Sequence, residues 1–132
     1  MTQAIVDTWL ARFVNSALAH DLDAHMAMIA PDVLVFGVPG FETLEFADWY
    51  RQCEHEFPQG LLTGLTYDRL KIRTAAQDHV LFKALETSRT RDGNSTRQAV
   101  EMLIRHDAGS ATWKLKQMRL LPEDEARRDG LI

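Results

Sequence analysis

The stretch HVLFKALETSRTRDGNSTRQAVEMLIRHDAGSATWKLKQMRLL, residues 79–121, decides the fold of this chain. It contains three segments in which polar and apolar side chains alternate, and such alternation is typical of β-strands with one buried face. Asp92-Gly93-Asn94 joins the first two segments and supplies the residue types that a tight hairpin turn needs. A second turn at 107–111 leads into the third segment. The stretch therefore predicts a three-stranded antiparallel meander.

The even-numbered residues of the first two strands form the expected inner face of the sheet, because strand side chains alternate between faces. With the three-residue turn, Phe82 lies opposite Ile104 and Glu86 lies opposite Val100. A shift of one residue would mix apolar and charged positions on both faces, which is disfavoured where one face is buried. We therefore expect the even face to look inward.

The third strand changes phase along its length. Trp113 and Leu115 continue the inner face, but past Gln117 the apolar pattern inverts. A β-bulge adds one residue and reverses the alternation of side chains. We therefore expect a bulge near Lys116–Met118, without which Arg119 would point inward.

Three helices and two further strands are expected earlier in the chain. Apolar residues recur at helical spacing over residues 3–19, 22–30 and about 43–57. A short apolar strand at 33–38 and a strand with one polar face at 61–74 complete the pattern. The predicted fold class is α+β, with three N-terminal helices packed on the concave face of a curved, mostly antiparallel sheet.

Length and composition predict a single domain. The chain has 132 residues, of which 45% are hydrophobic, so it can bury a genuine core. We expect one domain over residues 1–132, with a charged and solvated tail at about 123–132. The net charge of −4 and the scattered basic residues argue against nucleic-acid binding. The single cysteine suits a reducing cytoplasm, and neither a signal peptide nor a membrane span is expected.

Three short pieces together resemble the nuclear-transport-factor-2-like superfamily, and in particular its SnoaL-like branch. They are Asp-Leu-Asp at 21–23, Ala-Pro-Asp-Val at 30–33 and Thr-Trp-Lys-Leu at 112–115. The resemblance covers about residues 4–122. It implies a cone-shaped fold, usually dimeric, with a deep apolar pocket between the helices and the concave sheet. Members of the superfamily include ketosteroid isomerases, polyketide cyclases, epoxide hydrolases, dehydratases and non-catalytic proteins, so the activity has to be argued from the site.

The catalytic pattern of the family's ketosteroid isomerases is not preserved. Phe13 stands where the resemblance places a tyrosine, and Gly37 stands about where it places the general-base aspartate. The family's buried acid on the penultimate strand corresponds to Glu101 or Met102. The family's epoxide hydrolases use an Asp-Arg-Asp arrangement, and residues 105–107 match only Arg-x-Asp, at a strand end beside a turn.

Three residues are candidates for acid–base chemistry. Glu86 lies on the inner face, where an unpaired carboxylate in an apolar wall would have a raised pKa; the alternative is a position at the wet rim or a pair with Arg119. His106 shares this face by parity and titrates near neutral pH, although the adjacent turn favours a surface position. Tyr50 is a plausible hydroxyl donor.

Apolar residues of the helices and strands could line a pocket for a small apolar or aromatic ligand, although each alone fits ordinary core as well. The candidate ligand-binding residues are Trp9, Phe13, Phe36, Trp49, Tyr50, Cys53, Phe82, Met102, Ile104 and Gln117. We expect Cys53 to be a small, buried apolar residue rather than a nucleophile. No cofactor motif is present. No metal site is expected, because His20 and His25 are poorly spaced for shared ligation and residues 54–56 diverge around their helix.

The odd-numbered face of the meander mixes leucines with charges, which suggests a two-fold homodimer contact. Its members are Leu81, Lys83, Leu85, Glu101, Leu103 and Arg105. Partial cover by another segment of the chain is the alternative. Three functions therefore stay open: a ligand-binding enzyme of acid–base type, a non-catalytic ligand-binding module, and a structural or partner-binding dimer.

Overall fold

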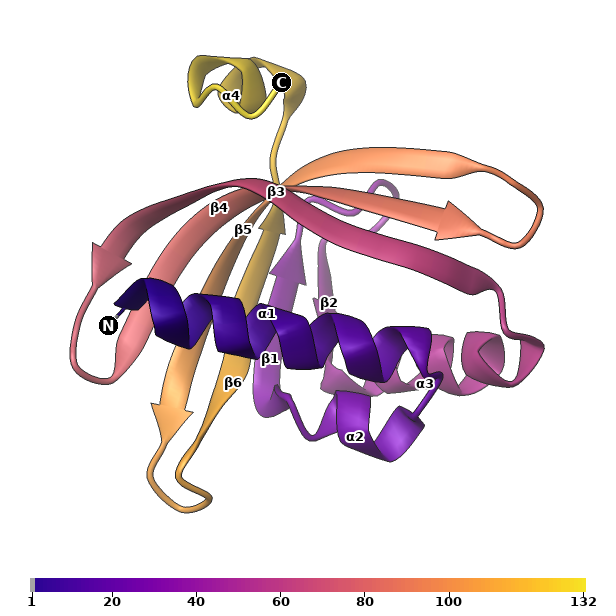
Figure 1. Cartoon of the computed structure of the whole chain (residues 1–132), viewed down its shortest axis with the longest axis horizontal. Coiled ribbons are helices and arrows are strands. Elements are labelled where there is room, and N and C mark those ends of the chain that lie inside the picture. The colour runs from indigo at the N-terminus through magenta and orange to yellow at the C-terminus, as the bar shows by residue number, and fades with distance from the viewer. Residues whose placement is uncertain (1) are drawn as a thin grey trace.

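A computed structural model describes residues 2–132 and shows an arched sheet with helices on both faces (Figure 1). The helices are α1 (Thr2–Leu18), α2 (Leu22–Met26), α3 (Phe46–Glu56) and α4 (Glu123–Arg128), with a 3₁₀ turn at Phe57–Gln59. The strands are β1 (Ile29–Phe36), β2 (Thr43–Glu45), β3 (Leu62–Ala75), β4 (His79–Thr90), β5 (Ser95–Asp107) and β6 (Thr112–Leu120). Their order in the sheet is β2-β1-β6-β5-β4-β3, and only the β1–β6 pair is parallel.

The predicted α+β class and the three N-terminal helices on the concave face are confirmed (Figure 1). Helix α1 crosses the sheet and buries the stripe that carries Val6, Trp9 and Phe13. It packs on the even face of the meander, where Phe82 and Met102 are fully buried. Burying a large apolar side chain contributes about 1.5–3 kcal/mol, so this interface is the main core of the fold.

The β4–β5 register differs from the predicted one by two residues. Phe82 pairs with Met102 and Glu86 pairs with Gln98. The loop is Arg91-Asp92-Gly93, one step earlier than predicted, and Gly93 provides the positive φ of 89°. A shift of two residues keeps every side chain on its face, so the predicted inner face is confirmed although its pairs were wrong.

The predicted bulge in β6 is present. Leu103 pairs with Gln117 and Ile104 pairs with Leu115, which leaves Lys116 as the extra residue. Beyond the bulge, Arg119 points to the outer face. Gln117 also lies outward beside Leu103, so its expected inward position was wrong, because the bulge precedes it rather than follows it.

Strand β3 has three register shifts against β4, and the central one, which bears on the site, was not predicted. Asp68 pairs with Leu85 and Lys71 pairs with Lys83, so β3 has one residue more than β4 over this interval. Arg69 sits in the bulge with a φ of +56°. The extra residue reverses the alternation, so Tyr67 joins the inner face rather than the polar face on which the sequence pattern placed it.

The segments before β3 are divided differently from the prediction. Helix α2 already ends at Met26, and Pro31 lies within β1, where the pairing with β6 is irregular. Strand β2 was missed. It precedes α3, whose first turn is closed by a capping box in which the Glu45 backbone N–H donates to the Asp48 carboxylate at 2.9 Å.

The C-terminal tail is folded, which corrects the expectation of a solvated segment. Helix α4 packs on the outer face of the sheet, opposite the other three helices (Figure 1). Leu131 is fully buried in a cluster with Leu85 and Ala126. Lys83, itself almost fully buried, forms ion pairs with Asp129 at 2.6 Å and Glu125 at 3.3 Å. The tail therefore covers part of the face that was expected to be free.

None of the helices within residues 2–132 is long and apolar enough to cross a membrane.

Candidate functional site

A cavity of about 360 Å³ lies between α1, α3 and the concave face of the sheet. This size falls within the range of small-molecule pockets. The apolar part of its wall consists of Phe13, Ala17, Val35, Val38, Leu44, Trp49, Phe57, Leu62, Leu65, Met118 and Leu120. The side chains that bring chemistry to it are His25, Gln52, Cys53, Glu56, Tyr67, Glu86 and Ser88.

Three of the ten candidate ligand-binding residues line this cavity: Phe13, Trp49 and Cys53. The others lie elsewhere. Phe82, Met102 and Ile104 face α1 as expected, but they are fully buried in solid core. Trp9 borders a different hollow, Phe36 and Tyr50 are partly buried outside the lining, and Gln117 lies on the outer face.

Glu86 brings a carboxyl group into the cavity from β4, with Tyr67 of β3 directly opposite. The Tyr67 hydroxyl donates a hydrogen bond of 2.6 Å to Glu86 Oε2. Burial raises the pKa of Glu86, and the bond from Tyr67 opposes this only in part. Burial and the neighbouring carboxylate raise the pKa of Tyr67 well above its usual value. Glu86 can therefore exchange a proton while Tyr67 stays neutral.

His25 of α2 is a second ionisable group in the wall, and it is only 3% exposed. Its Nδ1 lies 3.0 Å from Ser16 Oγ, which in turn donates to the Phe13 carbonyl oxygen at 2.9 Å. Burial lowers the pKa of His25 to about 4, although a hydrogen bond to the Phe13 backbone opposes the shift. The imidazole is therefore neutral at physiological pH.

The ring of Phe13 lies close to both His25 and Tyr67, the hydrogen-bond partner of Glu86. Its centroid lies 4.6 Å from that of His25, 6.3 Å from that of Tyr67 and 6.1 Å from that of Trp49. Part of the cavity wall is therefore aromatic, and it carries the Glu86–Tyr67 pair and a neutral imidazole, with Glu56 as a further carboxyl group in the lining. Aromatic walls of this kind suit a flat or alicyclic ligand.

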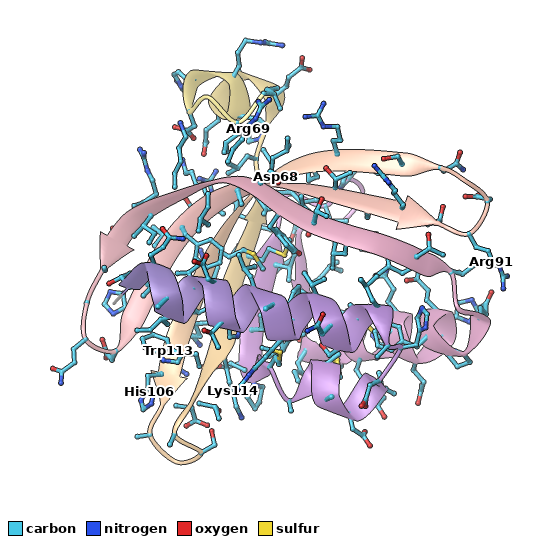
Figure 2. All side chains as sticks on the ribbon, viewed as in Figure 1. Asp68, Arg69, Arg91, His106, Trp113 and Lys114 are labelled. Atoms are coloured by element: carbon cyan, nitrogen blue, oxygen red, sulfur yellow. The ribbon has the colours of Figure 1, made fainter. Side chains whose placement is uncertain are left out.

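Two of the three candidate acid–base residues lie outside this enclosure. His106 is exposed near the end of the β5–β6 hairpin, where it packs edge-on against Trp113 with centroids 5.4 Å apart (Figure 2). Tyr50 points elsewhere from α3 and is not part of the lining. Glu86 is in the cavity, and it pairs with Tyr67 rather than with Arg119, which binds Glu101 and Glu125 on the outer face.

The sequence pattern missed His25 and Tyr67. The partner of His25, Ser16, is on another helix, and nothing in the sequence spacing links the two residues. Strict alternation along 61–74 puts Tyr67 on the polar face, and the bulge at Arg69 reverses that alternation. The change from Leu65 and Tyr67 to Leu70 and Ile72 as the apolar positions was the available signal.

The Cys53 thiol is unsuited to nucleophilic chemistry. Burial, and secondarily the charge of Glu56, raise its pKa to about 11, so it remains a neutral thiol at physiological pH. Its side chain serves as part of the apolar wall.

The sequence resemblance placed Gly37 about where ketosteroid isomerases carry their general-base aspartate, and the backbone here disfavours any side chain. Gly37 has a φ of +88°, and a Cβ there would lie 2.5 Å from the Leu120 carbonyl oxygen. Any side chain would therefore force β1 and β6 apart. Glu101, the possible counterpart of the third isomerase group, faces outward to Arg119.

A larger, open groove of about 950 Å³ lies outside the core, between α1, α2 and the tip of the β5–β6 hairpin. Trp9 and Trp113 contribute to its floor, and Figure 2 shows Trp113 and Lys114 at this end of the molecule. Neither of the buried ionisable groups Glu86 and Tyr67 reaches it. The smaller cavity is therefore the better candidate for chemistry.

Within residues 2–132, no three His, Cys, Asp or Glu side chains come close enough together to hold a metal ion.

The sequence profile of the SnoaL-like domain matches residues 6–120, which is most of the chain. The chain belongs to the SnoaL-like family. No curated protein matches it significantly. Solved NTF2-like structures share the fold of this SnoaL-like domain.

An NTF2-like protein from Cytophaga hutchinsonii has a TM-score of 0.74 at 10% identity, with 91% of this chain and 97% of that chain covered. A candidate scytalone dehydratase from Novosphingobium aromaticivorans has a TM-score of 0.71 at 11% identity, with 90% and 82% covered. An NTF2-like protein of unknown function from Pseudomonas putida has a TM-score of 0.69 at 16% identity, with 91% and 87% covered. At these identities the similarity establishes the fold of the SnoaL-like domain alone.

Proposed function

We propose that this SnoaL-like protein binds a small, largely apolar ring compound in the cavity and moves a proton on it through Glu86. The observation that carries the proposal is the Glu86 carboxyl group, which sits in an apolar wall with a raised pKa and a single hydrogen bond, from Tyr67. A carboxyl group with a pKa moved toward neutrality is suited to general acid–base catalysis.

Glu86 Oε2 accepts the hydrogen bond from the Tyr67 hydroxyl, so Oε1 is the oxygen left for a ligand. In the ionised form, Oε1 can take a proton from a carbon next to a carbonyl group and return it to another position. In the protonated form, the same group can donate to a departing hydroxyl. Isomerisation, cyclisation and dehydration all need this exchange, and a candidate scytalone dehydratase shares the fold.

The proposal is tested by deuterium exchange on a model ketone. 2-Tetralone is a bicyclic aromatic ketone of suitable size, and its α-protons exchange with D₂O when a base removes them. We expect the wild-type protein to accelerate this exchange, measured by ¹H NMR. Glu86→Gln should reduce the acceleration about 100-fold or more, the usual effect of losing a general base. Glu54→Gln, an exposed α3 carboxylate outside the cavity, is the matched control.

A non-catalytic binding module is the second candidate, favoured by Phe13 and Gly37 at the isomerase positions. Saturable binding of 2-tetralone without accelerated exchange would support the module and reject the enzyme. If 2-tetralone and a panel of aromatic, terpenoid and steroid compounds all leave the melting temperature unchanged, the small-ligand function itself is rejected.

A further inference from the structure

His25 is a polar group in the cavity wall that the proposed proton transfer does not use. Ser16 has one hydroxyl proton, and it donates that proton to the Phe13 carbonyl oxygen at 2.9 Å. Toward His25, Ser16 Oγ can therefore only accept, over 3.0 Å. Nδ1 must then carry the proton of the neutral imidazole, and Nε2 keeps a free lone pair.

The bare Nε2 is open to the cavity. It has no hydrogen-bond partner within residues 2–132, and the one fully buried side-chain polar atom there without a partner is Trp9 Nε1. Nε2 is therefore accessible, although the His25 side chain as a whole is only 3% exposed. His25 lines the cavity, so Nε2 is the polar atom that His25 can offer to a ligand there.

Aromatic rings surround His25 and fix its orientation. The centroids of Phe13, Phe57 and Trp49 lie 4.6, 5.6 and 6.2 Å from that of the imidazole. The ring is held by the hydrogen bond with Ser16 and by tilted and edge-on contacts with the three aromatic rings, which restrict the movement of Nε2. Such a fixed acceptor discriminates strongly between ligands that do and do not supply a proton to it.

We infer that His25 Nε2 orients the ligand by accepting a hydrogen bond from it, so that the cavity selects ring compounds that carry a hydroxyl group. The inference rests on the proposed function and deepens it. The ring of the ligand lies among Phe13, Trp49 and Phe57, its hydroxyl group binds His25, and Glu86 acts elsewhere on the same molecule. His25 is thus a specificity-determining residue.

The test compares two probes that differ only in the donor, 2-naphthol and its methyl ether 2-methoxynaphthalene. Binding is followed by calorimetry or by quenching of tryptophan fluorescence. We expect the wild-type protein to bind 2-naphthol about tenfold more tightly than the ether, the effect of one buried hydrogen bond. His25→Phe keeps the ring and the packing but removes Nε2. It should weaken 2-naphthol binding about tenfold and leave the ether unchanged.

The other outcomes separate the inference from the proposed function. If His25→Phe keeps the preference and Glu86→Gln abolishes it, the hydroxyl group binds Glu86 and the inference is rejected while the ligand-binding function stands. If neither probe binds the wild-type protein, both are rejected for this ligand class. A ¹⁵N NMR spectrum of the wild-type imidazole provides a check independent of any variant, because a proton on Nε2 at pH 7 would overturn the inference.

Discussion

At the scale of single residues, the cavity combines two opposite consequences of burial. Removing a carboxyl group from water raises its pKa, as for Glu86, and removing an imidazole lowers its pKa, as for His25. Both residues are thereby biased toward their neutral forms. With these two residues neutral, the inner part of the wall suits an apolar ligand, and charge can develop on Glu86 when a proton moves; Glu56 is a further carboxyl group in the lining.

The buried His25 predicts a loss of stability in acid. The unfolded chain binds a proton at His25 below pH 6.5, whereas the folded chain resists it until pH is near 4. The free energy of unfolding therefore falls as pH drops from about 6.5 to about 4, by on the order of 3 kcal/mol from this residue. His25→Phe and His25→Gln should both lack this component in urea titrations across the range.

The two replacements separate charge from packing, because only phenylalanine keeps an aromatic ring against Phe13. Their curves should be parallel to each other and flatter than that of the wild-type protein. A wild-type curve with the same slope as both variants would show that His25 takes up its proton without resistance in the folded state.

Among individual residues, the sequence identified Glu86 because a lone carboxylate on an apolar strand face is visible in the alternation. It did not identify His25, since its role depends on Ser16 and on three aromatic rings that only the folded chain assembles. His106 was a candidate because its even number places it on the inner face of the sheet. The alternation does not show how far along the strand the helices cover that face, and His106 lies beyond them.

At the scale of elements, phase changes within strands decide which side chains reach the cavity. The β6 bulge was predictable, because apolar residues stand on both sides of it. The β3 bulge was hidden, because Asp68 and Arg69 interrupt the apolar pattern where the phase changes. Helix α4 was missed for a related reason: a run of charges conceals the apolar positions Ala126 and Leu131.

Leu131 is predicted to hold the α4 segment on the sheet. It is fully buried, whereas its neighbour Ile132 is 45% exposed. Leu131→Ala should lower the free energy of unfolding by about 2–4 kcal/mol, as for other buried leucines that leave a cavity. Ile132→Ala, the matched control, should change it by less than about 0.5 kcal/mol. Chemical denaturation measures both, and equal values would show that the segment does not stabilise the sheet.

At the scale of the whole molecule, α4 leaves part of the outer face uncovered. Leu34, Gln117, Leu103 and Leu81 pair successively across β1, β6, β5 and β4. Leu34 is 37% exposed, and Leu81 and Leu103 are partly exposed. A partly exposed row of three leucines interrupted only by the uncharged Gln117 is a surface suited to a two-fold interface. We propose that two copies pair through this row, beside α4.

Light scattering at micromolar concentration should then give a mass twice the 15.0 kDa of one chain. Leu103→Glu places a charge in the centre of the row and should yield monomers with little change in far-UV circular dichroism. Ala11→Glu, at an exposed position of α1 on the opposite face of the sheet, should leave the dimer intact. A monomeric wild-type protein would contradict the proposed dimer.

The bulge at Arg69 in β3 influences contacts on both faces of the sheet. On its N-terminal side the strand aims Tyr67 at Glu86, and at the bulge itself Arg69 donates to the Leu131 carbonyl oxygen at 3.0 Å beside α4 (Figure 2). Deleting that residue would straighten the strand. We expect the deletion both to turn Tyr67 out of the interior and to remove the contact of Arg69 with the C-terminal segment. A replacement of the C-terminal segment would therefore remove the acceptor of Arg69, two residues from the tyrosine that binds Glu86.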